Sequence, residues 1–157
     1  MWCPEYAREY LARNGVNYSY DDLLEIAKGQ LALEDEYFTA MNNSDCGLPG
    51  TSCHLFIDTD MYVMKVWSEF VFEKCHRFIL QEIVERKYDL YLLCNTDLPW
   101  VDDELREYPD LLTRKKLFRI YKDIMINQPV PWIEIEGDYE HRLKKAVAAI
   151  DRLFPAG

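Results

Sequence analysis

Several features are scarce or missing in this sequence. Lys and Arg number 18 against 28 Asp and Glu, which gives a net charge of −10. Binding along a nucleic acid needs a basic stripe, and none is visible, so nucleic acid is excluded as a main partner. No apolar run approaches the length of a membrane span, so we expect no membrane partner either. The sequence therefore predicts a soluble, cytoplasmic globular protein.

Internal repeats, low-complexity tracts and linker-like stretches are also absent. With 157 residues, the chain is long enough for one domain with a real core. We therefore predict a single domain over residues 1–157. The sequence gives no indication of the oligomeric state.

The number and spacing of the cysteines argue against a disulfide framework and against a zinc site. The five cysteines form no paired spacing and their number is odd; they are Cys3, Cys46, Cys53, Cys75 and Cys94. Neither feature fits a disulfide framework or a paired-thiolate zinc site. We therefore expect free thiols.

Short apolar segments alternate with helical patterns along the chain. The predicted strands are the tail of a strand at Trp2–Cys3, then His54–Asp58, Tyr88–Cys94 and Trp132–Ile135. The predicted helices are Glu5–Asn14, Tyr20–Met41, Met61–Lys87 with a possible break near Cys75, Asp110–Asn127 and Asp138–Phe154. This alternation predicts an α/β fold, with a mostly parallel sheet and helices on both of its faces.

Local signals mark several helix ends. Gly15 stands where a helix from Glu5 would close, and Ser19 with Asp22 fits a capping box. In the last helix the predicted buried stripe consists of Ala146, Ala149, Ile150 and Leu153.

The loop after the Tyr88–Cys94 strand combines an aromatic residue, acids and cations. It carries Trp100, the acids Asp102 and Asp103, and arginines at 106 and 114. Open α/β sheets build ligand sites at the carboxyl ends of their strands, and arginines at this spacing suit phosphate. The alternative is a solvated acidic loop with a buried Trp anchor.

Two further clusters of charge stand near predicted strand ends. Asp58 and Asp60 follow a predicted strand, where carboxylates hold magnesium through water or orient a substrate hydroxyl. The alternative is that Thr59 or Asp60 caps the next helix, and both roles are compatible. Glu5 and Arg8 share one helix face, and their alternative is a surface ion pair.

Together, five segments resemble the NadR-type ribosylnicotinamide kinase domain, a P-loop kinase. They are CPEYAREYL at 3–11, YDDLLEIAKGQ at 20–30, FIDTD at 56–60, YDLYLLC and DLPWVDDELRE within 88–107, and IEGDYEHRLKKA at 135–146. The resemblance implies transfer of the ATP γ-phosphate to the 5′-hydroxyl of nicotinamide riboside, with magnesium, giving nicotinamide mononucleotide. The implied ligands are thus ATP, Mg²⁺ and nicotinamide riboside.

The resemblance also implies roles for individual residues. Asp58 and Asp60 match the family's acidic strand end and would orient the ribose hydroxyl or, for Asp58, hold magnesium. In the substrate loop, the match covers Trp100, whose indole would stack on the cationic pyridinium ring, and Asp103.

The remaining matches are charged residues. Arg106 and Arg114 match lid cations that would neutralise the transferring phosphoryl group. Glu5 and Arg8 match the family's EYARE block beside the substrate pocket. Glu104 departs from the small residue expected in the lid.

The larger departure is the phosphate-binding loop. No GxxxxGK[ST] occurs in the sequence, and the segment 47–52 has glycines but no lysine. We therefore expect an N-terminally incomplete kinase domain that lacks its first strand, P-loop and first helix, with impaired activity. The alternative function is a catalytically inactive module, derived from this family, that binds a nucleoside or a partner.

Overall fold

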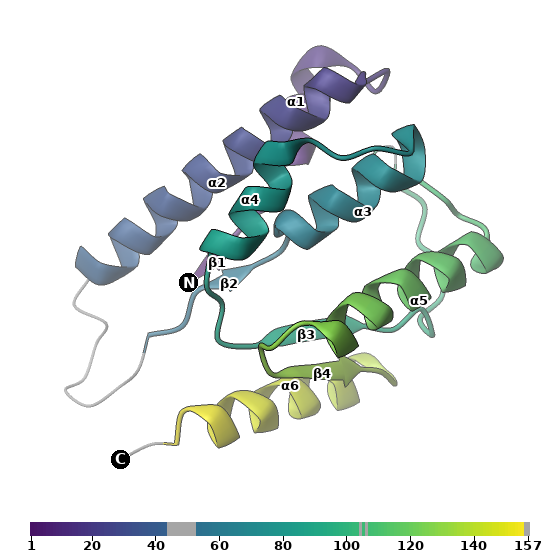
Figure 1. Cartoon of the computed structure of the whole chain (residues 1–157). Coiled ribbons are helices and arrows are strands. Elements are labelled where there is room, and N and C mark those ends of the chain that lie inside the picture. The colour runs from purple at the N-terminus through teal and green to yellow at the C-terminus, as the bar shows by residue number, and fades with distance from the viewer. Residues whose placement is uncertain (44–52, 104, 106, 156–157) are drawn as a thin grey trace. The chain divides into compact units, whose positions relative to one another are not determined.

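The computed structural model describes residues 1–43, 53–103, 105 and 107–155. Within it the chain forms two compact units, Met1–Arg86 and Lys87–Gly157 (Figure 1). Each unit is described here by itself. The single domain over 1–157 stays a prediction.

In its described residues, the first unit contains a short parallel sheet and four helices. Strand β1 (Trp2–Cys3) pairs with β2 (Phe56–Ile57), with Trp2 opposite Phe56 and Cys3 opposite Ile57. The helices are α1 (Tyr6–Asn14), α2 (Tyr20–Asn43), α3 (Met61–Phe72) and α4 (Arg77–Glu85). The predicted break near Cys75 is confirmed, because Glu73 adopts a left-handed φ of 56° and ends α3.

Both predicted signals between α1 and α2 are confirmed. Gly15 has a φ of 90°, and its N–H donates to Leu11 O to close α1. Asp22 N–H donates to Ser19 Oγ at 3.3 Å, and Ser19 N–H donates back to Asp22 Oδ2 at 2.8 Å, which is the reciprocal pattern of a capping box.

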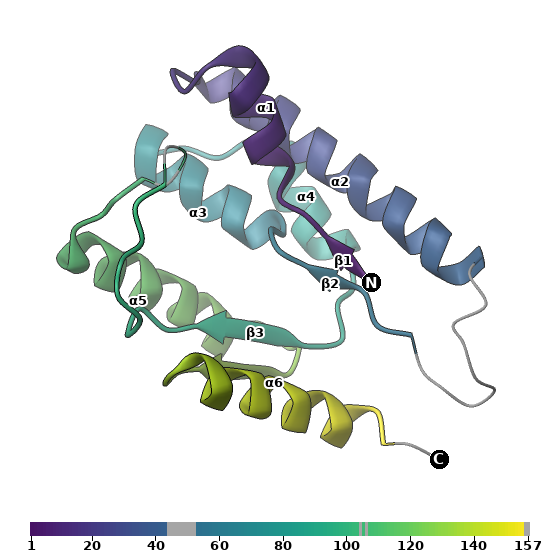
Figure 2. The same ribbon diagram turned by 180° about the vertical axis from the view of Figure 1, so that it is seen from behind.

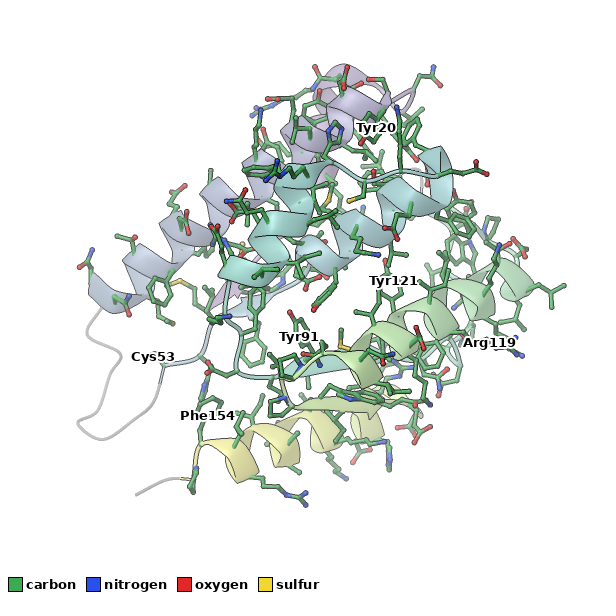
Figure 3. All side chains as sticks on the ribbon, in the orientation of Figure 1. Tyr20, Cys53, Tyr91, Arg119, Tyr121 and Phe154 are labelled. Carbon is green, nitrogen blue, oxygen red and sulfur yellow. The ribbon has the colours of Figure 1, made fainter. Side chains whose placement is uncertain are left out.

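The core of the first unit is built mainly by α2 and its neighbours. Its buried members are Ala7, Leu23, Ile26, Ala27, Leu31, Met61, Met64 and Ile79. Aromatic residues of α3 and α4 surround this core and are only partly buried, among them Trp67, Phe72 and Phe78. At the start of α2, the ring of Tyr20 (labelled in Figure 3) stacks on His76 with centroids 3.7 Å apart.

The second unit has a parallel strand pair between two helices. Strand β3 (Tyr91–Cys94) pairs with β4 (Trp132–Ile135) residue for residue. Helix α5 (Leu111–Asn127) packs on β3 and α6 (Tyr139–Leu153) packs on β4, and they lie on the two sides of the pair in Figures 1 and 2. Helices on both faces are therefore seen in this unit.

The predicted buried stripe of α6 is only half-buried. Ala146, Ala149 and Ile150 are partly exposed, and Leu153 is exposed. A sheet of two strands offers a narrow strip of surface, which is too little to bury a full helix face.

The α/β fold with parallel strands is confirmed, but the described strands form two sheets of two strands each. Cys3, Cys75 and Cys94 form no disulfide. Cys53 belongs to a disulfide, so the expectation of a free thiol is wrong there. Odd number and irregular spacing argue against several bridges, but they do not exclude a single one.

No helix in the described part of the chain is long and apolar enough to cross a membrane.

Candidate functional site

The carboxyl ends of β1 and β2 lie side by side, because the two strands run parallel in register. Asp58 N–H donates to Cys3 O at 3.2 Å and ties the two chain exits together. After β1, Glu5 is the N-cap residue of α1. After β2, Asp60 is the N-cap residue of α3. The sheet therefore brings two of the predicted site clusters to one edge of the first unit.

At the first exit, Glu5 and Arg8 form an ion pair with Glu5 Oε2 3.2 Å from Arg8 Nε. Their side chains are 31% and 42% exposed, so the pair is accessible to a ligand. An exposed i,i+3 pair adds little stability. The surface ion pair predicted as the alternative is thus present, and it leaves a role in binding open.

At the second exit, Asp58 and Asp60 take different positions. Asp60 is the N-cap of α3, and its Oδ1 accepts the N–H of Val63 at 3.0 Å. The predicted capping role is therefore confirmed for Asp60. Asp58 is exposed, so its carboxylate is the more accessible of the two.

This edge is also negatively charged. Burial is the main reason why the pKa of the Cys3 thiol is raised to about 11, and the negative charges of Glu34 and Asp58 contribute to this rise. The Cys3 thiol is therefore protonated and inert at neutral pH. The same negative charges would raise the pKa of any acid bound at this edge, because they disfavour a further anion.

In the second unit, the loop after β3 brings Trp100 and Arg114 together. The Arg114 guanidinium lies over the Trp100 ring, 5.3 Å from its centroid, and Nη2 donates to Leu98 O at 3.3 Å. Trp100 is half-buried. The indole face is therefore within reach of a cation, as the predicted stacking role requires.

The rest of that loop is organised by carboxylates. Asp103 Oδ1 accepts the N–H of Leu105 at 3.0 Å. Asp110 caps α5 through the N–H of Thr113 at 2.8 Å, and this hydrogen bond lowers the pKa of Asp110. Arg106 and Glu104 lie outside the described residues.

Asp97 and Arg142 form a hydrogen-bonded pair, here called the clamp, that the sequence did not predict. Arg142 donates to Asn95 O at 3.0 Å, to Gly137 O at 2.9 Å and to Asp97 Oδ1. Asp97 Oδ2 accepts the N–H of Gly137 at 2.6 Å, and this bond is the main reason why the pKa of Asp97 lies below its usual range. The clamp joins the loop after β3 to the turn between β4 and α6.

A second missed residue is Gln30, which is fully buried in α2. Its signal was a polar residue in register with the apolar positions Ile26, Ala27 and Leu31. The signal for Arg142 was its place in the block at 135–146, which shares the resemblance but received no role.

The predicted site residues are thus divided between the units. Glu5, Arg8, Asp58 and Asp60 share the β1–β2 edge of the first. The second unit holds the loop residues Trp100 and Asp103 and the α5 residue Arg114.

Magnesium and ATP fit this chain differently. Among the described residues, no three His, Cys, Asp or Glu side chains gather to hold a metal ion. One exposed carboxylate, Asp58, nevertheless suits magnesium, which is commonly held by one or two carboxylates with water and substrate phosphates. The triphosphate does not fit in the same way, because no glycine-rich loop ending in Lys-Ser or Lys-Thr occurs in the sequence.

Comparison with known proteins places the chain in a family. The profile of a family described as "AAA domain" matches residues 1–142. The chain is 24% identical over 155 residues to the Trifunctional NAD biosynthesis/regulator protein NadR of Escherichia coli (strain K12), and equally to that of Salmonella typhimurium (strain LT2). These matches cover 96% of this chain and 35% of each relative's length.

Proposed function

Because the chain belongs to the AAA domain family of P-loop proteins, we propose that it is a ribosylnicotinamide kinase-like protein with impaired activity. The reaction of such a kinase is ATP-dependent phosphorylation of nicotinamide riboside to nicotinamide mononucleotide, a step of NAD biosynthesis. Support comes from the two relatives, whose printed name includes NAD biosynthesis.

The observation that carries the proposal is the shared carboxyl edge of β1 and β2. There the Glu5–Arg8 pair follows β1, and the exposed Asp58 follows the neighbouring strand β2. Asp58 would accept the proton of the ribose 5′-hydroxyl as general base. Glu5 and Arg8 offer one acceptor and one donor group for further hydroxyls of the sugar.

The other residues of the resemblance belong to the second unit, which is considered by itself. Trp100 would stack on the pyridinium cation, with Asp103 on the same loop. Arg114, and Arg106 eight positions earlier in the sequence, would neutralise phosphate charge. In the absence of ligand, the Arg114 guanidinium lies over the Trp100 ring.

In the alternative role, Asp58 would hold magnesium instead of accepting the proton, with water and substrate oxygens completing the coordination. When bound, magnesium neutralises charge on phosphate oxygens. No step is derived through ATP, because the residues that would cradle its phosphates are absent from the sequence. The chain alone should therefore transfer phosphate slowly at best.

A second candidate function follows from the same observation. A chain that keeps the acceptor-side residues without a phosphate cradle would serve as a nucleoside-binding or partner-binding module. The two candidates differ in whether nucleoside binding is coupled to ATP.

Calorimetric titration of the full chain with nicotinamide riboside, with and without ATP and magnesium, tests the proposal. We expect saturable binding that Asp58→Asn weakens about tenfold, the loss of roughly one charge-assisted hydrogen bond. Binding that is independent of ATP favours the module. Absence of any nicotinamide riboside binding would overturn both candidates as nucleoside sites.

A further inference from the structure

Gln30 is completely buried, although its side chain is polar. A buried amide is costly unless its donor and acceptor atoms are paired. In α2 it takes a position that apolar residues would fill more easily. The reason for a glutamine here lies in what its amide contacts.

The Gln30 amide binds the backbone on both sides of Glu5. Its Oε1 accepts the N–H of Tyr6 at 2.8 Å, and its Nε2 donates to Pro4 O at 3.4 Å. Nε2 also lies 3.7 Å from Cys3 Sγ, at the end of β1. One side chain therefore holds the short connection between β1 and α1.

This contact replaces the usual helix cap. Glu5 is the N-cap residue of α1, and its own side chain makes no capping hydrogen bond in the described structure. The N–H of Tyr6 is one of the four that a helix start leaves without an intrahelical partner, and Gln30 satisfies it. The Glu5 carboxylate instead lies 3.2 Å from Arg8.

The residue before Gln30 is adapted to the same connection. A Cβ at Gly29 would lie 2.0 Å from Cε1 of Tyr6, so only glycine lets this ring rest on the α2 backbone. Gly29 thus receives the Tyr6 ring and Gln30 receives the Tyr6 N–H. Together they fix where α1 starts.

We infer that Gln30 is a positioning residue that orients the Glu5–Arg8 pair at the carboxyl edge of β1. The meaning of this pair for nucleoside binding rests on the proposed function. The geometric claim does not, since it concerns contacts within the first unit only.

The geometric claim is tested by NMR of the Arg8 Nε–H group in the full chain. Gln30→Glu keeps the shape and accepts the Tyr6 N–H, but when ionised it cannot donate to Pro4 O. Gln30→Leu removes both bonds. We expect the Arg8 Nε–H signal in both variants to move toward its position in Glu5→Gln, and Gln81→Leu, at an exposed site on α4, to leave it unchanged.

The functional claim is tested by a double-mutant cycle on nicotinamide riboside affinity. Gln30→Glu should weaken binding about tenfold in the wild-type background, equivalent to about one hydrogen bond. In the Glu5→Gln background the same substitution should cause no further loss, because Gln30 acts through Glu5. Its effect on the melting temperature should be equal in both backgrounds.

The outcomes separate the two claims. An unchanged Arg8 signal in Gln30→Glu, or the same tenfold loss with and without Glu5, overturns the inference. If wild-type protein binds no nicotinamide riboside, the proposed function fails, and the Arg8 signal alone decides the positioning role. If Gln30→Leu does not fold, Gln30→Glu carries both measurements.

Discussion

The ring of Tyr6 rests directly on the backbone of Gly29, so that a Cβ built at Gly29 would stand 2.0 Å from Tyr6 Cε1. Helix α1 and helix α2 therefore meet at a point where the Tyr6 ring leaves no room for a side chain at position 29. This contact gives the first prediction, because it opposes the normal preference of helices for alanine.

Gly29→Ala should destabilise the protein, although Gly to Ala inside a helix ordinarily stabilises by about 1 kcal/mol. The overlap with the Tyr6 ring forces a backbone or ring shift, for which a cost of about 1–3 kcal/mol is typical. Urea unfolding measures the net effect. In a Tyr6→Ala background the sign should reverse, and equal destabilisation in both backgrounds would show that the ring is not the cause.

Asp22 should give α2 a pH-dependent stability. Hydrogen bonds from Ser19 and from the Tyr10 hydroxyl lower the pKa of Asp22 from 3.8 to about 2. The ionised form is favoured in the folded state, so its contribution is complete above pH 3.8 and is lost as the pH falls toward 2. Asp22→Asn should flatten the pH dependence of urea unfolding in this window.

Asp21→Asn is the matched control for this prediction, since Asp21 lies one residue earlier in the same helical turn. It should keep the wild-type pH dependence. A wild-type slope in Asp22→Asn would assign the acid sensitivity to other carboxylates.

The sequence predicted the features that depend on neighbouring residues. The Gly15 helix end, the Ser19–Asp22 capping box and the bounds of Trp132–Ile135 all match the structure. The helix end and the capping box depend on residues within about four positions, where local chemistry decides the conformation. The strand Trp132–Ile135 also needs its partner β3, so only its apolar pattern is local.

Features that depend on distant partners were missed. The strand predicted at His54–Asp58 keeps only two residues, because β1 offers only Trp2 and Cys3 for pairing. Gln30 acts on Tyr6, 24 positions away, and Arg142 acts on Asn95, 47 positions away. Spacing within a helix cannot reveal which backbone groups a folded chain brings to it.

Arg142 should stabilise the second unit, because it joins the loop after β3 to the turn between β4 and α6. Arg142→Ala would leave the carbonyl groups of Asn95 and Gly137 and the carboxylate of Asp97 without this donor. We expect a loss of about 2 kcal/mol in the free energy of unfolding. Arg142→Lys should restore part of it, because an ammonium group reaches fewer of the three acceptors than a guanidinium.

Arg152→Ala, in the last turn of the same helix, is the control and should change stability little. If it costs as much as Arg142→Ala, the loss reflects helix charge and not the clamp.

Asp60 should act on stability through its cap. Asp60→Ala removes the acceptor of the Val63 N–H and should cost about 1 kcal/mol, whereas Asp60→Asn keeps a good capping residue and should cost little. Thermal melts of both variants measure this difference. Since Asp60→Asn removes the charge but keeps the cap, a loss of nicotinamide riboside affinity in this variant would reveal a second, binding role.

Trp100 should discriminate between charged and uncharged bases. The Arg114 guanidinium already lies 5.3 Å from the centre of its ring, so the indole face accepts a cation. Trp100→Ala should weaken binding of nicotinamide riboside by roughly 3- to 30-fold, the range of a cation–π contact. Binding of the reduced, uncharged form of the same nucleoside should change much less, because it lacks the cationic ring.

Calorimetry on both nucleoside forms makes this comparison directly. Trp100→Phe should retain part of the preference, since a phenyl ring binds cations less strongly than an indole. Trp2→Ala, an exposed tryptophan of the first unit, serves as the control and should leave the ratio of the two affinities unchanged. Equal losses for the two forms in Trp100→Ala would mean that the indole supports the loop and does not recognise the charge of the base.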